Sequence, residues 1–228
     1  METCYMCDQP QTGKEHVPPR CIFPEGKDSP RKTYRTNLFT VPSCDAHNSR
    51  KSKEDEFFLI YMASCASANQ VGILHQQTKL MRIVERKPHV FAEMLKNSMP
   101  ATLDKGQGRI EETCAFLLDR ERVNTQLEHI ARALYFWHYK SKWLSPLIVI
   151  PLQGLTDSDQ SANAAAISIA ARSAGLLRSL PRLGSNQDVF YYQVVDDEDG
   201  QVIHAVFFDG MKIAFAYPTT FEHEPLES

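Results

Sequence analysis

Two short cysteine and histidine pairs near the N-terminus are the residues best suited to chemistry. Cys4 and Cys7 are separated by two residues, and Cys44 and His47 repeat that spacing further along the chain. Three thiolates and one imidazole form a tetrahedral ligand set that zinc commonly takes in proteins. A two-residue gap lets both members of a pair reach one ion from a tight turn. The sequence therefore predicts one structural zinc ion, bound by these four residues.

An acid–histidine pair, Glu15 and His16, lies between the two halves of this ligand set and is followed by Val-Pro-Pro. His16 is an alternative zinc ligand in place of His47, but the symmetry of the two spaced pairs favours His47. With four ligands assigned, Glu15, His16 and Asn48 are left for other chemistry. Because Asn48 directly follows His47, a bound zinc ion would also hold the Asn48 backbone in place.

Length and composition predict a globular protein of one or two domains. The 228 residues are 43% hydrophobic and 23% charged, which is enough apolar surface for a core. The first ten residues lack the basic start and apolar centre of a signal peptide, and no apolar run is long enough to cross a bilayer. We therefore expect a cytoplasmic protein whose six cysteines stay reduced, as metal ligands or buried side chains.

Charge is distributed unevenly, although the net charge is only -3. Nine lysines and arginines face four acids between residues 14 and 53, whereas one lysine faces nine acids from residue 187 to the end. The basic segment could face a polyanion and the acidic segment should repel one. An asymmetric but merely solvated surface fits the same pattern equally well.

Three segments follow one another along the chain, and together they predict an α+β fold. Residues 1–55 are rich in proline, glycine and cysteine, which suits a small metal-bound domain with a short strand in 37–44 and a short helix after it. Residues 56–143 form a helical segment. Residues 144–228 combine a strand at 146–152 and an alanine-rich helix at 158–175 with a three-stranded antiparallel meander between 188 and 217.

The helical segment has its clearest signal in the stretch 108–140, which we expect to be the longest helix. Apolar residues recur there at steps of three and four, which is the spacing of one buried helix face. These residues are Val123, Leu127, Ile130, Leu134 and Trp137. A further helix is expected over 70–87, ending before Pro88, and another from Ser52, whose hydroxyl precedes an acid by three residues.

In combination, the N-terminal motifs resemble those of the HNH endonucleases, which have a ββα-metal fold. The resemblance covers roughly residues 1–55. It rests on the first cysteine pair, on the Glu-His-Val-Pro-Pro stretch, and on the second pair followed at once by Asn48, with Lys51 three residues later. It implies a structural Zn²⁺, a catalytic Mg²⁺ or Mn²⁺, and DNA as the substrate.

The resemblance also implies roles for individual residues. His16 matches the general base that activates water, and Glu15 and Asn48 match the ligands of the catalytic ion. Asn37 is the nearest match to the asparagine that orients the catalytic loop, about two residues earlier than the usual spacing. The residues placed to contact phosphates are Arg20, Arg50 and Lys51.

Small proteins of this family often occur in bacterial anti-phage or mobile-element loci, sometimes beside an ATPase subunit, so a partner protein of that kind is implied as well. The alternative is a zinc-scaffolded module that binds nucleic acid or protein without cleavage. Five other histidines and three other cysteines lack partners at useful spacing, so we expect them to be structural or idle. They are His75, His89, His129, His138, His204, Cys21, Cys65 and Cys114.

Overall fold

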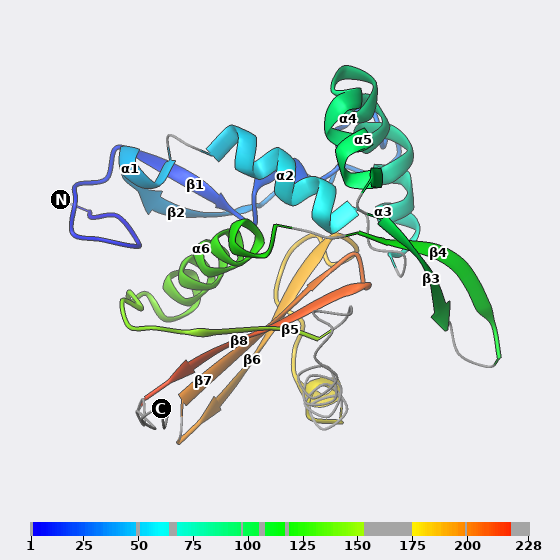
Figure 1. Cartoon of the computed structure of the whole chain (residues 1–228). Coiled ribbons are helices and arrows are strands. Elements are labelled where there is room, and N and C mark those ends of the chain that lie inside the picture. The colour runs from blue at the N-terminus through cyan, green and yellow to red at the C-terminus, as the bar shows by residue number, and fades with distance from the viewer. Residues whose placement is uncertain are drawn as a thin grey trace, which may run out of the picture.

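Helices and three antiparallel sheets build the computed structural model (Figure 1), which confirms the predicted α+β class. The structure describes residues 2–48, 51–63, 68–96, 98–104, 108–116, 119–152, 175–198 and 200–219. Within these residues the sheets have two, two and four strands. No helix among them is long and apolar enough to cross a bilayer.

The N-terminal segment folds into a hairpin of β1 (Gly13–Val17) and β2 (Phe39–Ser43), followed by the short helix α1 (Asp45–Asn48). A single turn of 3₁₀ helix, η1 (Arg20–Ile22), follows β1. The predicted strand and helix around the second metal pair are thus confirmed. The acid–histidine pair lies in β1, where the pairing with β2 places Glu15 opposite Val41 and His16 opposite Thr40.

The middle segment begins with α2 (Lys51–Ala63) and continues through α3 (Gln70–His75), η2 (Gln76–Leu80) and α4 (Met81–Arg86). The side chain of Asn69 caps α3 by accepting hydrogen bonds from the N–H groups of Val71 and Gly72. The predicted helix over 70–87 is confirmed, with one π-helical turn, η2, inside it. Pro88 then opens α5 (Pro88–Lys96) at a position that needs no N–H donor.

The expected helix over 108–140 is wrong in its first part. Residues 110–116 form β4 (Ile110–Phe116), which pairs with β3 (Ser98–Asp104), and α6 begins only at Arg120 (Arg120–Tyr139). Asp119 sets that start, because its carboxylate accepts a hydrogen bond from the N–H of Arg122. Four of the five residues expected on the buried face of α6 are buried: Val123, Leu127, Ile130 and Leu134. The fifth, Trp137, is half-buried and packs at the edge of the core.

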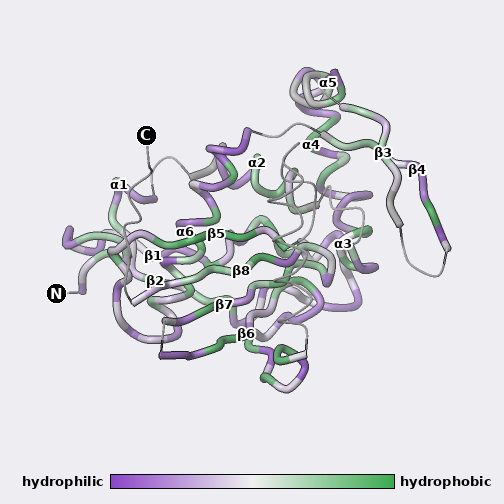
Figure 2. The backbone as a smooth tube through the Cα atoms, turned by 60° about the horizontal axis from the view of Figure 1, so that its bottom comes forward, coloured by the Kyte–Doolittle hydropathy of each residue, from purple (hydrophilic) through white to green (hydrophobic). Residues whose placement is uncertain are grey.

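The C-terminal segment is a four-stranded antiparallel sheet in the order β5-β8-β7-β6. Its strands are β5 (Ile148–Pro151), β6 (Phe190–Asp197), β7 (Gly200–Phe207) and β8 (Met211–Pro218). The predicted strand and the predicted meander are therefore confirmed, and hydrophobic residues recur along these strands (Figure 2). The expected alanine-rich helix lies almost entirely outside the described residues.

One hydrophobic core joins the three segments, with α6 between the hairpin and the four-stranded sheet (Figure 1). On one side of α6, the rings of Trp137 and Phe39 of β2 lie 4.8 Å apart. On the other side, the buried Tyr217 of β8 donates a hydrogen bond to the carbonyl of Ala131. Packing against α6 therefore holds the hairpin to the rest of the protein.

Candidate metal centre

The four predicted zinc ligands come together in space. The Nδ1 atom of His47 lies 3.3 Å from the Sγ atoms of Cys4 and Cys44 and 3.6 Å from that of Cys7, and the two Sγ atoms of Cys7 and Cys44 are 3.8 Å apart. Tetrahedral zinc with bonds of about 2.3 Å to sulfur and about 2.0 Å to nitrogen requires S–S and S–N separations of roughly 3.8 and 3.5 Å. The cluster could therefore hold a metal ion such as zinc.

Two tight turns present these ligands. The N–H of Cys4 donates to the carbonyl of Gln9, which closes the first turn, and the N–H of His47 donates to the carbonyl of Cys44, which closes the second. The turns are tied together because the N–H of Tyr5 donates to the carbonyl of Pro42 in β2. Cys4 and Cys44 are buried, as expected for ligands of a closed structural site.

The thiol of Cys44 is prepared for the thiolate form that a metal requires. Burial by itself raises the pKa of this thiol, but the backbone N–H groups of His47 and Ala46, together with the Cys7 thiol, lower it below its usual value. Hydrogen bonds that favour a charged form lower the pKa of an acid in this way. Burial and the same contact between the thiols raise the pKa of Cys7, so only the backbone N–H groups favour the thiolate form at Cys44.

Glu15 is fixed on the buried face of the hairpin and is only 5% exposed. Its Oε2 atom accepts hydrogen bonds from the hydroxyl of Tyr5 at 3.3 Å and from the hydroxyl of Ser43 at 3.4 Å. Burial, and the adjacent carboxylate, raise the pKa of Tyr5 well above its usual value. Tyr5 therefore stays protonated and donates to Glu15 across the physiological pH range.

His16 lies on the opposite face of β1. Successive side chains of a strand point to opposite faces, so the burial of Glu15 turns His16 the other way, beside Thr40. His16 is half-buried, and Lys14 on the same face is exposed. The acid and the imidazole are adjacent along the backbone, but they face different sides of the hairpin.

Asn48 lies on the Glu15 side of the hairpin. It is the last residue of α1 and is exposed, and its Nδ2 atom would be 3.5 Å from a Cβ atom on Gly13. Gly13 and Glu15 are two positions apart in β1, so they share one face. Carboxylate and amide oxygens are the ligands that Mg²⁺ and Mn²⁺ prefer. Glu15, however, is buried and accepts two hydroxyl hydrogen bonds, whereas Asn48 is exposed.

The other predicted site residues are more scattered. Arg20 is exposed in η1, three residues beyond the end of β1. Asn37 has a left-handed backbone (φ 52°) in the loop before β2, and it lies near Val17, at the end of β1 away from the cluster. Arg50 lies outside the described residues, and for Lys51 the structure gives only its place at the start of α2.

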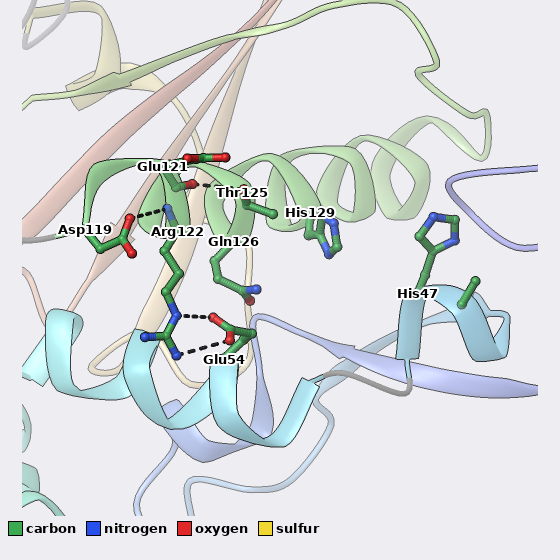
Figure 3. A pocket seen from close by; sticks show the side chains of 9 residues that line it. His47, Glu54, Asp119, Glu121, Arg122, Thr125, Gln126 and His129 are labelled. Atoms are coloured by element: carbon green, nitrogen blue, oxygen red, sulfur yellow. Dashed lines mark hydrogen bonds and ion pairs between the residues drawn. The ribbon is translucent and has the colours of Figure 1, made fainter. Parts of the chain in front are cut away.

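A cavity of about 530 Å³ opens beside the cluster, between the α1–α2 segment and α6 (Figure 3). The rings of His47 and His129 lie edge to face at one end of it, with centroids 6.3 Å apart. At the other end Glu54 forms a bidentate ion pair with Arg122. The sequence suggested no role for His129, since its spacing relates it to no other ligand. Only the packing of α6 against the hairpin of β1 and β2 brings it to this site.

Two of the remaining histidines are structural, as expected. His75 and His204 are buried, and burial lowers the pKa of each to about 4, so both stay neutral. The Nε2–H of His75 donates to the carbonyl of Cys21, which ties α3 to η1. Cys114, in contrast, is exposed on β4.

In comparisons with known proteins, no family model, no curated protein and no solved structure matches this chain. The residues and their geometry are therefore the whole basis for a function.

Proposed function

We propose that this protein is a zinc-stapled endonuclease that hydrolyses phosphodiester bonds in DNA with the help of Mg²⁺ or Mn²⁺. The observation that carries the proposal is the hairpin itself. The adjacent Glu15 and His16 lie on β1, and Asn48, directly after the ligand His47, lies against the start of the same strand. A purely structural zinc site requires its four ligands but none of these three residues.

In this proposal each residue has one task. Glu15 and Asn48 hold the divalent ion, which when bound stabilises the charge that develops on the scissile phosphate. The resemblance alone assigns to His16 the task of accepting a proton from the attacking water, a task suited to an imidazole. In the structure His16 faces the other side of β1 from Glu15 and Asn48, so the assignment of the base is the weakest part of the proposal. Arg20, Arg50 and Lys51 contact backbone phosphates and therefore add affinity without sequence preference.

The two proposed metal sites select different ions because their ligands differ in chemistry. The thiolates of Cys4, Cys7 and Cys44 are soft ligands that select zinc, whereas the oxygen atoms of Glu15 and Asn48 are hard ligands that suit Mg²⁺ or Mn²⁺. Removal of the divalent ion by mild chelation should therefore stop cleavage before zinc is lost. Restoring Mg²⁺ should then restore activity.

A second candidate is a module that binds nucleic acid or protein through the same scaffold and does not cut. The burial of Glu15, with Oε2 accepting from two hydroxyl groups, and the opposite orientation of His16 favour this reading, because both features also suit a purely structural strand. A role in anti-phage defence beside an ATPase partner belongs to the first candidate and is tested by co-purification from the native operon.

The activity of the Asn48→Ala variant distinguishes the nuclease from the module that binds without cutting. We expect this variant to keep its zinc and its DNA affinity and to cleave supercoiled plasmid about 10²-fold more slowly, the usual cost of losing an electrostatic contact to the transition state. Asn48→His should retain part of the activity, since imidazole also binds divalent ions, with a shifted preference between Mg²⁺ and Mn²⁺.

The matched control is Asp45→Ala, which removes an exposed carboxylate from the same helix and breaks its hydrogen bond from the hydroxyl of Thr12. It should cleave at the rate of the unmodified protein. Equal rates for Asn48→Ala and the unmodified protein would place the second metal elsewhere. An absence of cleavage in Mg²⁺ and in Mn²⁺, with operon partners present, would favour the binding module.

A further inference from the structure

The cavity between α6 and the α1–α2 segment contains a buried polar side chain that is suited to hold a ligand (Figure 3). Gln126 of α6 lines this cavity and is only 6% exposed, and its amide lies between α6 and α2. The amide makes no hydrogen bond to the part of the chain that the structure describes. Buried amide groups nearly always have such a partner, because burial without one costs free energy. Gln126 therefore offers a donor and an acceptor to a bound molecule.

The charges around the cavity favour a cationic ligand. Glu54 and Arg122 neutralise each other through their bidentate ion pair. Asp119 and Glu121 lie at the same end, are exposed, and form no ion pair with the described residues. The other end has the same sign, because three thiolates and one Zn²⁺ would leave the ligand cluster with one negative charge. Phosphate and carboxylate groups are therefore repelled from the cavity, and ammonium groups are attracted to it.

The dimensions of the cavity favour an extended cation over a compact one. Its volume of about 530 Å³ is typical of sites for small organic molecules. Glu121 and His129 line its two ends and are eight positions apart on α6, which is about 12 Å along the helix axis. A metal ion could reach only one end. The described residues contain a single group of side chains close enough to hold a metal ion, and it is the zinc cluster beside the cavity.

We propose that this cavity binds a linear aliphatic polyamine of the size of spermidine. One terminal ammonium group donates to the carboxylates of Asp119 and Glu121, and the central one donates to the amide oxygen of Gln126. The other terminal group lies beside the zinc-loaded cluster, where the net charge is negative. Charge-assisted hydrogen bonds of this kind are among the stronger polar contacts in proteins. The inference does not depend on the proposed nuclease activity.

The first test is calorimetric titration of spermidine into the full chain with zinc bound, at about 0.15 M NaCl to screen non-specific attraction. One molecule should bind per chain. Putrescine, a shorter diamine without the central amino group, should bind about tenfold more weakly, and the neutral adenosine should not bind. Gln126→Leu should also weaken spermidine binding about tenfold. This variant should melt no lower than the unmodified protein, because leucine has no hydrogen bond to lose.

The charge contribution has its own test. Asp119→Asn combined with Glu121→Gln removes both carboxylates but keeps a residue that can cap α6, and it should weaken spermidine binding about tenfold. The matched control combines Glu112→Gln with Glu198→Gln, which removes two exposed carboxylates that do not line the cavity and should leave the affinity unchanged.

Four results would each overturn the proposal. They are an absence of spermidine binding up to about 1 mM, equal affinity for putrescine or binding of adenosine in place of spermidine, equal weakening by the two double variants, and a melting temperature of Gln126→Leu that falls by several degrees. The last result would mean that the amide of Gln126 has a structural role in place of ligand binding.

Discussion

His16→Ala is expected to abolish DNA cleavage while one zinc ion per chain and the thermal stability are retained. If His16 is the general base of the proposed nuclease, its removal should lower the rate by about 10²- to 10⁴-fold. Zinc should stay, because the His47 Nδ1 atom already completes the cluster with the three Sγ atoms. The half-buried side chain on a hairpin face makes a melting temperature within about 3 °C of the original the expected result.

The matched control is His89→Ala, since His89 is exposed on α5 and remote from the hairpin. Cleavage of supercoiled plasmid, zinc content and thermal unfolding are measured on all three proteins. If zinc were lost from His16→Ala, the roles of His16 and His47 would have to be exchanged. If His16→Ala cut as fast as the His89 control, His16 would not be the base.

Cys44→Ser is expected to remove the metal ion and unfold the hairpin. A structural zinc ion contributes about 10 kcal/mol or more of binding free energy, which is comparable with the whole stability of a typical domain. A serine hydroxyl is a poor substitute for a thiolate in the ligand set. Since Phe39 of β2 packs against Trp137 of α6, the loss should spread into the core and lower the melting temperature of the whole protein.

The control for this variant is Cys114→Ser, whose thiol is exposed on β4 and far along the chain from the cluster. It should bind one zinc ion per chain and melt at the original temperature. Zinc is measured by elemental analysis of protein purified without added metal, and unfolding by circular dichroism. A Cys44→Ser protein that still carries one zinc ion and melts normally would contradict the assignment of these ligands.

Three features could be predicted from the sequence because residues close together in the chain determine them. They are the ligand cluster, the buried face of α6 and the C-terminal meander. A two-residue gap between ligands defines a tight turn by itself, and the 3.6-residue helix period marks Leu127 and Leu134 as buried without knowledge of their partners. The turn residues between the last three strands likewise act locally, so adjacent strands pair as expected.

The tertiary structure alone decided the rest. From its local sequence, the stretch Ile110–Phe116 is expected to begin a helix. It forms a strand instead because it pairs with β3, and strand pairing depends on residues outside the stretch itself. The pairing of β1 with β2 places the side chain of Glu15 on the inner face of the hairpin and that of His16 on the outer face. The sequence shows only that the two residues are adjacent. His129 lies beside His47 because α6 and the hairpin pack into one core. The spacing of residues along the chain does not predict a contact between two elements so far apart in sequence.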